Sequence, residues 1–205
     1  PVGLFANNRN LKTITITTSN LKSIESYSFI GCSSLTQIQI PSSVTLIGKE
    51  VFSGCTSLES VSVPNGLQAI GDQTFKQCES LKSIIIPSSV TVLGSQLFDQ
   101  CTNLESVSIL ASIKTLGSNT FEKSLKLKQV ALSDTINDID DSTFYGCSSL
   151  ETVVMPTSLK TIGKNAFREC SKLKDITIPA TVTSIGDNAF DGDESLQSVT
   201  IPSTL

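Results

Sequence analysis

The chain has 205 residues, of which 39% are hydrophobic and 17% are charged, and its formal net charge is -4 with a sequence pI near 4.8. This composition is that of a folded chain, and its acidic balance argues against a phosphate-binding surface, which needs clustered Lys and Arg. Apolar runs are short, as at Ile84 to Ile86, and none approaches the roughly 20 residues of a membrane span. We therefore expect neither nucleic-acid binding nor membrane insertion by this chain.

A strict repeat of 23 residues organises the sequence. Phe recurs at this interval from Phe29 to Phe190, and Leu recurs from Leu35 to Leu196, with no insertion or deletion. The Leu positions are Leu35, Leu58, Leu81, Leu104, Leu127, Leu150, Leu173 and Leu196. Such a period indicates a solenoid, because one short unit cannot bury its own apolar face and must stack on its neighbours. We predict one array over residues 1–205, with about eight repeats and a partial repeat at each end, as a fragment of a longer protein.

Each repeat begins with a predicted strand. The unit reads L-x2-[IV]-x-[IVLM]-P-x2-[VIL]-x2-[IL]-G-x3-F-x2-C-x2, and its apolar residues alternate after the Leu, as at Leu81, Ile84 and Ile86. Alternation is typical of a strand with one buried and one exposed face. The Pro that follows in most repeats ends the strand because it has no N–H for the ladder. We expect one short strand per repeat, and all strands in one parallel sheet about 4.8 Å apart.

The second half of each repeat predicts the return path. Gly occupies one slot in six repeats, at Gly48, Gly71, Gly94, Gly117, Gly163 and Gly186. Asp140 takes the same slot in another repeat, and Asp tolerates positive φ better than most residues, so we expect left-handed backbone there. The Phe then begins a short helical or irregular turn toward the next Leu. The predicted fold class is an α/β-type repeat solenoid, mostly β, with the turns on the side opposite the sheet.

All six cysteines occupy a single slot of the repeat. They are Cys32, Cys55, Cys78, Cys101, Cys147 and Cys170. An even number of cysteines in a secreted protein allows disulfides, but side chains that share a slot point inward in parallel, and Ser124 fills the same slot without a partner. We therefore favour buried free thiols over disulfides. Zinc needs close pairs such as C-x2-C, which the sequence lacks.

The sequence shows no catalytic constellation. It contains no His, which removes Ser–His and Cys–His pairs and imidazole metal ligands. We assign no catalytic residue, cofactor or metal site and expect no enzyme activity. The acidic run Asp134, Asp138, Asp140 and Asp141 has two interpretations, a calcium site or a solvated outer loop, and the loop is the simpler one.

The exposed face of the predicted strands is the candidate binding surface. One column alternates in charge through Glu59, Lys82, Glu105, Lys128, Glu151 and Lys174, so neighbours neutralise each other across the ladder. Two further columns are mostly short and neutral, with Ile85, Ala131 and Val154 as apolar exceptions, and a merely solvated face is the alternative. The candidate partner-binding residues are Gln37, Gln39, Ser60, Ser62, Ser83, Ile85, Ser106, Ser108, Gln129, Ala131, Thr152, Val154, Asp175 and Thr177.

From about Phe5 to Leu205 the unit resembles the BspA-like, or Treponema pallidum-type, 23-residue leucine-rich repeat. Sequence departures from the unit are Leu110 and Ser133 for Pro, Ser124 and Asp193 for Cys, and Asp140 for Gly. The resemblance implies a right-handed leucine-rich-repeat solenoid and a surface protein of the kind found in trichomonads, amoebae and oral bacteria.

For function, the same resemblance implies a non-catalytic interaction module of a cell-surface or secreted adhesin. Its ligands would be proteins or glycans of host cells, extracellular matrix or other microbes. Two alternatives stay open, namely an intracellular, cytoplasmic scaffold of the same fold and a structural array that self-associates through its uncapped ends.

Overall fold

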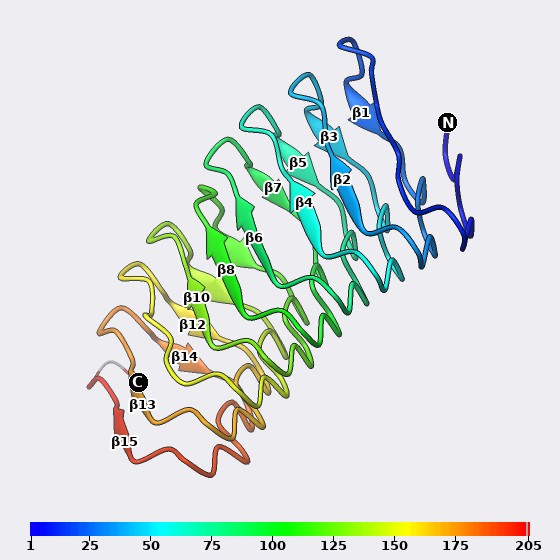
Figure 1. Cartoon of the computed structure of the whole chain (residues 1–205). Helices are drawn as coiled ribbons and strands as arrows, with labels where there is room; N and C mark the ends of the chain where they lie inside the picture. Colours follow the sequence, from blue (N-terminus) through cyan, green and yellow to red (C-terminus); the bar gives the residue numbers. More distant parts are fainter. Residues whose placement is uncertain (204) are drawn as a thin grey trace.

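The computed structural model describes residues 1–203 and 205, and it shows a solenoid whose repeats stack along one axis (Figure 1). The described residues form strands and turns, and they contain no helix. The predicted solenoid of parallel strands is confirmed. Of the two alternatives for the return path, the structure therefore has irregular turns.

The first row of strands follows the Leu of each repeat, as predicted. Its members are β2 (Gln37–Gln39), β4 (Ser60–Ser62), β6 (Ser83–Ile86), β8 (Ser106–Ile109), β10 (Gln129–Ala131), β13 (Asp175–Thr177) and β15 (Ser198–Thr200). Paired strands are parallel and shifted by one repeat, so that Ser83 lies opposite Ser106 and Ser106 opposite Gln129. Residues 151–156 have no assigned strand, so this row is interrupted between β10 and β13, and β4 and β6 also belong to separate sheets.

A second row of strands lies beside the first (Figure 1). It consists of β1 (Ser23–Ile24), β3 (Leu46–Ile47), β5 (Ala69–Ile70), β7 (Val92–Leu93), β9 (Thr115–Leu116), β11 (Asp138–Ile139), β12 (Thr161–Ile162) and β14 (Ser184–Ile185). The strands thus form two rows rather than the single predicted sheet. The two-residue segments before the Gly slot are too short to show alternation, but their backbone groups pair in register with the next repeat, as at Ile47 and Ile70.

Ladders of identical side chains fill the core. The Phe rings from Phe5 to Phe190 stack with centroid separations of 5.0 to 5.6 Å and interplanar angles of 7° to 13°. Every Leu of the repeat from Leu35 to Leu173 is fully buried, whereas Phe190 and Leu196 are half-buried. The predicted burial of both ladders is confirmed except in this last repeat.

The prediction of left-handed backbone at the slot of Gly48 and Gly94 was wrong. None of these six glycines has positive φ. A Cβ added at Gly94 would instead lie 2.3 Å from the backbone nitrogen of Asp72 and 2.5 Å from the carbonyl carbon of Gly71 in the preceding repeat. Gly is therefore needed because the backbones of adjacent repeats approach closely there.

Left-handed residues occur at two other slots, which the sequence analysis missed. One slot lies two residues after the Gly slot, as at Gln73 and Gln96, and the other directly precedes the Cys slot, as at Gln77 and Gln100. The N–H groups of Gln73 and Gln77 donate to carbonyls of the next repeat at 2.9 and 2.8 Å. The turns therefore form a ladder of their own.

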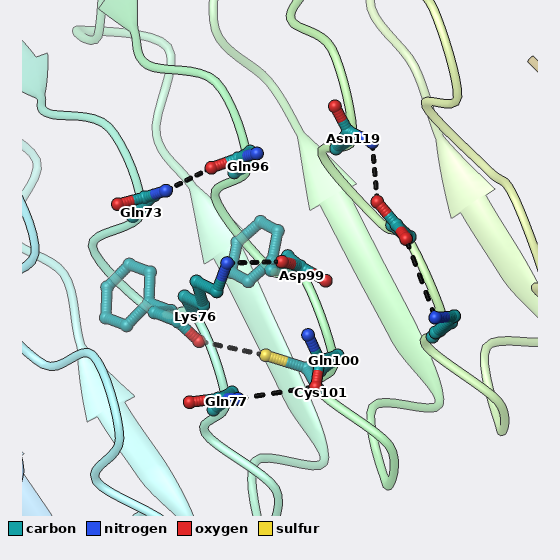
Figure 2. Close-up of polar contacts among 12 residues, drawn as sticks. Gln73, Lys76, Gln77, Gln96, Asp99, Gln100, Cys101 and Asn119 are labelled. Carbon is teal, nitrogen blue, oxygen red and sulfur yellow. Dashed lines mark hydrogen bonds and ion pairs between the residues drawn. The ribbon is translucent and has the colours of Figure 1, made fainter.

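Side chains continue this ladder between repeats. Figure 2 shows the amides of Gln73 and Gln96 paired across repeats, with Gln77 and Gln100 paired in the same way. Between these pairs, Lys76 contacts the buried carboxylate of Asp99 at 2.8 Å. The turn side thus carries side-chain contacts from one repeat to the next.

Candidate functional site

The candidate residues lie on the outward face of the first strand row. Ser106 and Ser108 are half-buried, and the other twelve of the fourteen candidates are exposed. Strand pairing places Ile85, Ser108 and Ala131 side by side in one column. The structure thus brings the candidates of β6, β8 and β10 together, whereas Thr152 and Val154 lie in the segment without an assigned strand.

The apolar exceptions on this face are prominent but separate. Ile85 is 61% exposed and Val154 is 81% exposed. Ser108 and Ala131 lie between them in the column, so the two large side chains do not merge into one patch. Exposed apolar groups of this size stabilise the fold little, because burial is the source of their contribution.

The charge column borders these residues, and its predicted neutralisation is confirmed at two pairs. Lys128 lies 3.4 Å from Glu105, and Lys174 lies 3.8 Å from Glu151. All four side chains are at least half exposed, so each pair contributes about 0 to 1 kcal/mol to stability. Most of the charge on this column is therefore available to a partner.

A shallow open groove of about 1240 Å³ runs along the N-terminal part of the strand face. Its lining includes four candidates, namely Gln37, Gln39, Ser60 and Ser62, together with Thr13, Thr15 and aliphatic residues such as Ile38 and the half-buried Val61. The turns 41–42 and 64–66 form its rim, which the sequence analysis missed. The sequence did mark this rim at Gly66, which has no side chain at the position of Ser43 and Ser89 in the neighbouring repeats. The hydroxyls of Ser43 and Ser89 donate to carbonyl oxygens of the preceding repeat.

The second strand row adds an apolar stripe, which the sequence pattern did not indicate. Leu46 is 43% exposed and Val92 is 59% exposed, and Ala69 lies between them in register. Smaller polar residues take the same column in later repeats, such as Thr115 and Ser184. This stripe is therefore restricted to three repeats.

The carboxylates of the acidic run brace the following repeat. Asp138 Oδ1 accepts a hydrogen bond from the Thr161 hydroxyl at 2.6 Å, and Asp141 Oδ1 accepts one from the Lys164 N–H at 2.8 Å. Burial, then the charges of Asp138 and Asp141, raise the pKa of Asp140. Within residues 1–203 and 205, no group of three or more His, Cys, Asp or Glu is placed to hold a metal ion.

The six cysteines are free and buried. Each thiol donates to a Phe carbonyl of the preceding repeat, as Cys101 Sγ does to Phe75 O at 3.0 Å (Figure 2). Ser124 does the same to Phe98 O at 3.1 Å. Burial raises the pKa of the Cys55 thiol to about 12, so this thiol is not a nucleophile at neutral pH.

We expect reductant to leave the melting temperature of the protein unchanged, because no disulfide constrains the unfolded chain. Thermal unfolding with and without dithiothreitol measures this. A fall of more than a few degrees under reducing conditions would contradict the assignment of free thiols.

Asp193 occupies the Cys slot of the last repeat and has an unusual environment. Its Oδ1 accepts the Cys170 N–H at 2.8 Å, while its buried Oδ2 has no hydrogen-bond partner among the described residues. Burial, with a smaller contribution from Asp191, raises the pKa of Asp193 to about 7. The folded chain therefore binds a proton here that the unfolded chain releases near the usual Asp pKa of about 3.9.

We expect the free energy of unfolding to fall as the pH rises from about 4 to about 7, because the native state binds more protons over this range. The change Asp193→Ser should flatten this dependence, since Ser124 shows that a hydroxyl fits the slot. Urea unfolding of both proteins across this range tests it. Identical pH profiles would show that Asp193 is ionised in the folded state.

Comparisons with known proteins agree with this architecture. The family model described as the BspA type leucine rich repeat region matches residues 2–128 and 93–205. No significant match was found among curated proteins. The chain does not contain, in its described residues, a helix that is long and apolar enough to cross a membrane.

Three solved structures are similar over most of the chain. A leucine-rich repeat protein from Eubacterium ventriosum is 30% identical with a TM-score of 0.80, and the match covers 88% of this chain but 48% of that protein. The T. pallidum leucine-rich repeat protein is 27% identical with a TM-score of 0.61, over 87% and 72% of the two chains. A leucine rich cell surface protein from Faecalibacterium prausnitzii is 25% identical with a TM-score of 0.50, over 98% and 69%.

The chain thus spans about half the length of the Eubacterium protein. The family model, in contrast, covers nearly all of its residues, and the strands, the Leu and Phe ladders and the Cys slot follow the same period. The chain belongs to the BspA-type leucine-rich repeat family.

Proposed function

We propose that this chain is a non-catalytic interaction module of a cell-surface or secreted array, and that it binds a protein or glycan ligand through the face of its first strand row. The observation that carries the proposal is the row of outward-facing, mostly polar side chains on β6, β8 and β10, which pair in register and are exposed except for the half-buried Ser106 and Ser108. Binding surfaces of this kind use many contacts along a rigid scaffold.

Two further observations support the proposal. The groove over β2 and β4 is lined by amide and hydroxyl side chains together with aliphatic residues such as Ile38 and Val61, so it can contact both polar and apolar groups of a ligand. The F. prausnitzii relative is described as a cell surface protein, which supports the same location for this chain. The face lacks aromatic anchors, so each stretch binds modestly and repeated contacts along a longer array raise the overall affinity.

We expect the double change Ile85→Lys and Val154→Lys to abolish binding to a host-cell or matrix ligand. Lys adds bulk and charge where Ile and Val are exposed, while the inward Leu and Phe ladders stay in place. Adhesion of the protein to immobilised cells and matrix measures the effect. The matched control replaces Asp141, in the outer loop, by Asn and should bind normally; binding that survives the first change and is lost with the second would contradict the proposed face.

A further inference from the structure

The charge column on the strand face has a symmetry of its own. Along the array it reads Thr36, Glu59, Lys82, Glu105, Lys128, Glu151, Lys174 and Gln197. When the column is aligned with its own reverse, every acidic residue lies opposite a basic one, and the neutral Thr36 and Gln197 lie opposite each other. The column is therefore complementary to its own reverse, with the centre between Glu105 and Lys128.

A two-fold axis in the plane of the face can use this symmetry. Rotation about an axis parallel to the strands keeps each column opposite itself and reverses the order of the repeats. If the axis lies between β8 and β10, Glu105 meets Lys128 of the second copy, Lys82 meets Glu151, and Glu59 meets Lys174. We propose that the strand face pairs with a second copy of this chain about this axis, an inference that rests on the proposed function because it assigns a partner to the same face.

The neighbouring columns match about the same axis. Ile85 and Val154, the two most exposed apolar side chains of the face, lie in repeats that come together, so each covers the other. Ser108 meets Ala131, and hydroxyl residues meet at Ser62 and Thr177. The charge column and the apolar pair Ile85 and Val154 are therefore symmetric about the same point, between β8 and β10. Pairing of the two copies would also explain why Ile85 and Val154 are exposed in the single chain, because both side chains are buried between the copies.

The spacing of the repeats favours a copy over an unrelated strand. Two identical arrays have the same spacing of about 4.8 Å between strands, so a contact made at one repeat is matched at its neighbours on either side of the axis. An extended peptide laid across the repeats has same-side residues about 6.6 Å apart and loses register within a few repeats. Aligned packing of two sheets across about 10 Å leaves room for the side chains of both faces.

The size of the face sets the expected strength. Six repeats give a contact of about 29 Å by about 15 Å, which is at the low end for specific interfaces. Each exposed pair of opposite charge contributes only weakly to affinity. We expect a pair that forms at micromolar or weaker affinity, weakens as salt rises and is strengthened in a longer array.

Analytical ultracentrifugation of the 205-residue chain tests the pair. We expect the wild-type protein to dimerise at low salt, and the single changes Glu105→Lys and Lys128→Glu each to weaken dimerisation by about tenfold or more, because each places two like-charge pairs across the axis. The matched control is Lys160→Glu, which reverses an exposed charge outside the first strand row and should dimerise as the wild type does.

Mixing the two single variants separates contacts between copies from contacts within a chain. Each variant has like charges at 105 and 128 of its own chain, and mixing does not relieve this. Across the axis, however, Lys at 105 of one variant then meets Glu at 128 of the other, so the mixture should form heterodimers with the strength of the wild-type pair. Circular dichroism confirms that each variant is folded.

Three outcomes would overturn the inference: a wild-type chain that stays monomeric up to roughly millimolar concentration, variants that dimerise like the wild type, or a mixture without recovery. The last two would place the contact elsewhere, such as the ends of the stack. Because Ile85 and Val154 lie in both proposed contacts, ligand binding is measured separately, as adhesion of the wild-type protein at concentrations too low for the pair to form.

Discussion

Replacing Phe98 by Ala should lower the free energy of unfolding by about 3 to 5 kcal/mol, the largest effect expected for a single change in this chain. Phe98 is fully buried, and its ring stacks between Phe75 at 5.6 Å and Phe121 at 5.5 Å. Ala leaves a cavity in the middle of the ladder, and backbone ladders on both sides of the ring limit how far the core can close around it. Urea denaturation followed by circular dichroism measures the loss.

Phe190→Ala is the matched control. Phe190 is half-buried and stacks on one described ring, Phe167 at 5.4 Å, so its truncation should cost clearly less than that of Phe98. Because repeats contact only their neighbours, the Phe98 change should also weaken coupling between the two halves of the array. Equal stability of Phe98→Ala and the wild type would refute the assignment of this ladder to the core.

The ladders and the first strand row could be predicted because they depend on residue type and period alone. An apolar residue that returns every 23 positions must have the same environment in each turn of the stack, as Leu81 and Phe98 do. The alternation after each Leu also predicted which side chains point outward, and the exposure of Ser83 and Ile85 follows it. Here the sequence pattern and the fold share one periodicity.

Features that depend on contacts between repeats could not be predicted in the same way. The two-residue strands such as β5 are defined by their pairing with the next repeat, and nothing within one unit shows that pairing. The groove likewise includes a small difference between repeats, since Gly66 in its lining is smaller than the Ser or Thr that takes this slot elsewhere. Whether the strand face binds a ligand depends on a partner, and that stays a proposal.

The Gly slot shows how one residue pattern permits two physical causes. Gly at a fixed position is required either where φ is positive or where another backbone leaves no room for a Cβ, and both give the same sequence signal. Asp140 favoured the first cause. In the structure, however, neither Gly71 nor Gly94 has positive φ, and both approach the backbone of the previous repeat closely. The two causes predict different results for substitution.

Gly94→Ala should therefore destabilise the chain by about 1 to 3 kcal/mol, or more where the backbone resists, through overpacking. Its Cβ would lie 2.3 Å from the Asp72 nitrogen, and that atom belongs to backbone that is itself fixed by the ladder, so it cannot rotate away as a side chain would. Relief requires the two repeats to move apart, which lengthens the hydrogen bond of 2.9 Å from Gly94 N to Ile70 O.

Gly66→Ala is the control for the loss of Gly alone. Gly66 is exposed, has no positive φ, and its added Cβ would meet only the Ser42 carbonyl oxygen at 3.4 Å. Its stability should stay within about 0.5 kcal/mol of the wild type. Urea unfolding of both variants gives the comparison. Similar losses of stability in Gly66→Ala and Gly94→Ala would contradict close approach between repeats as the reason for Gly at this slot. A loss confined to Gly94→Ala would show that Gly is needed for one turn to stack on the next.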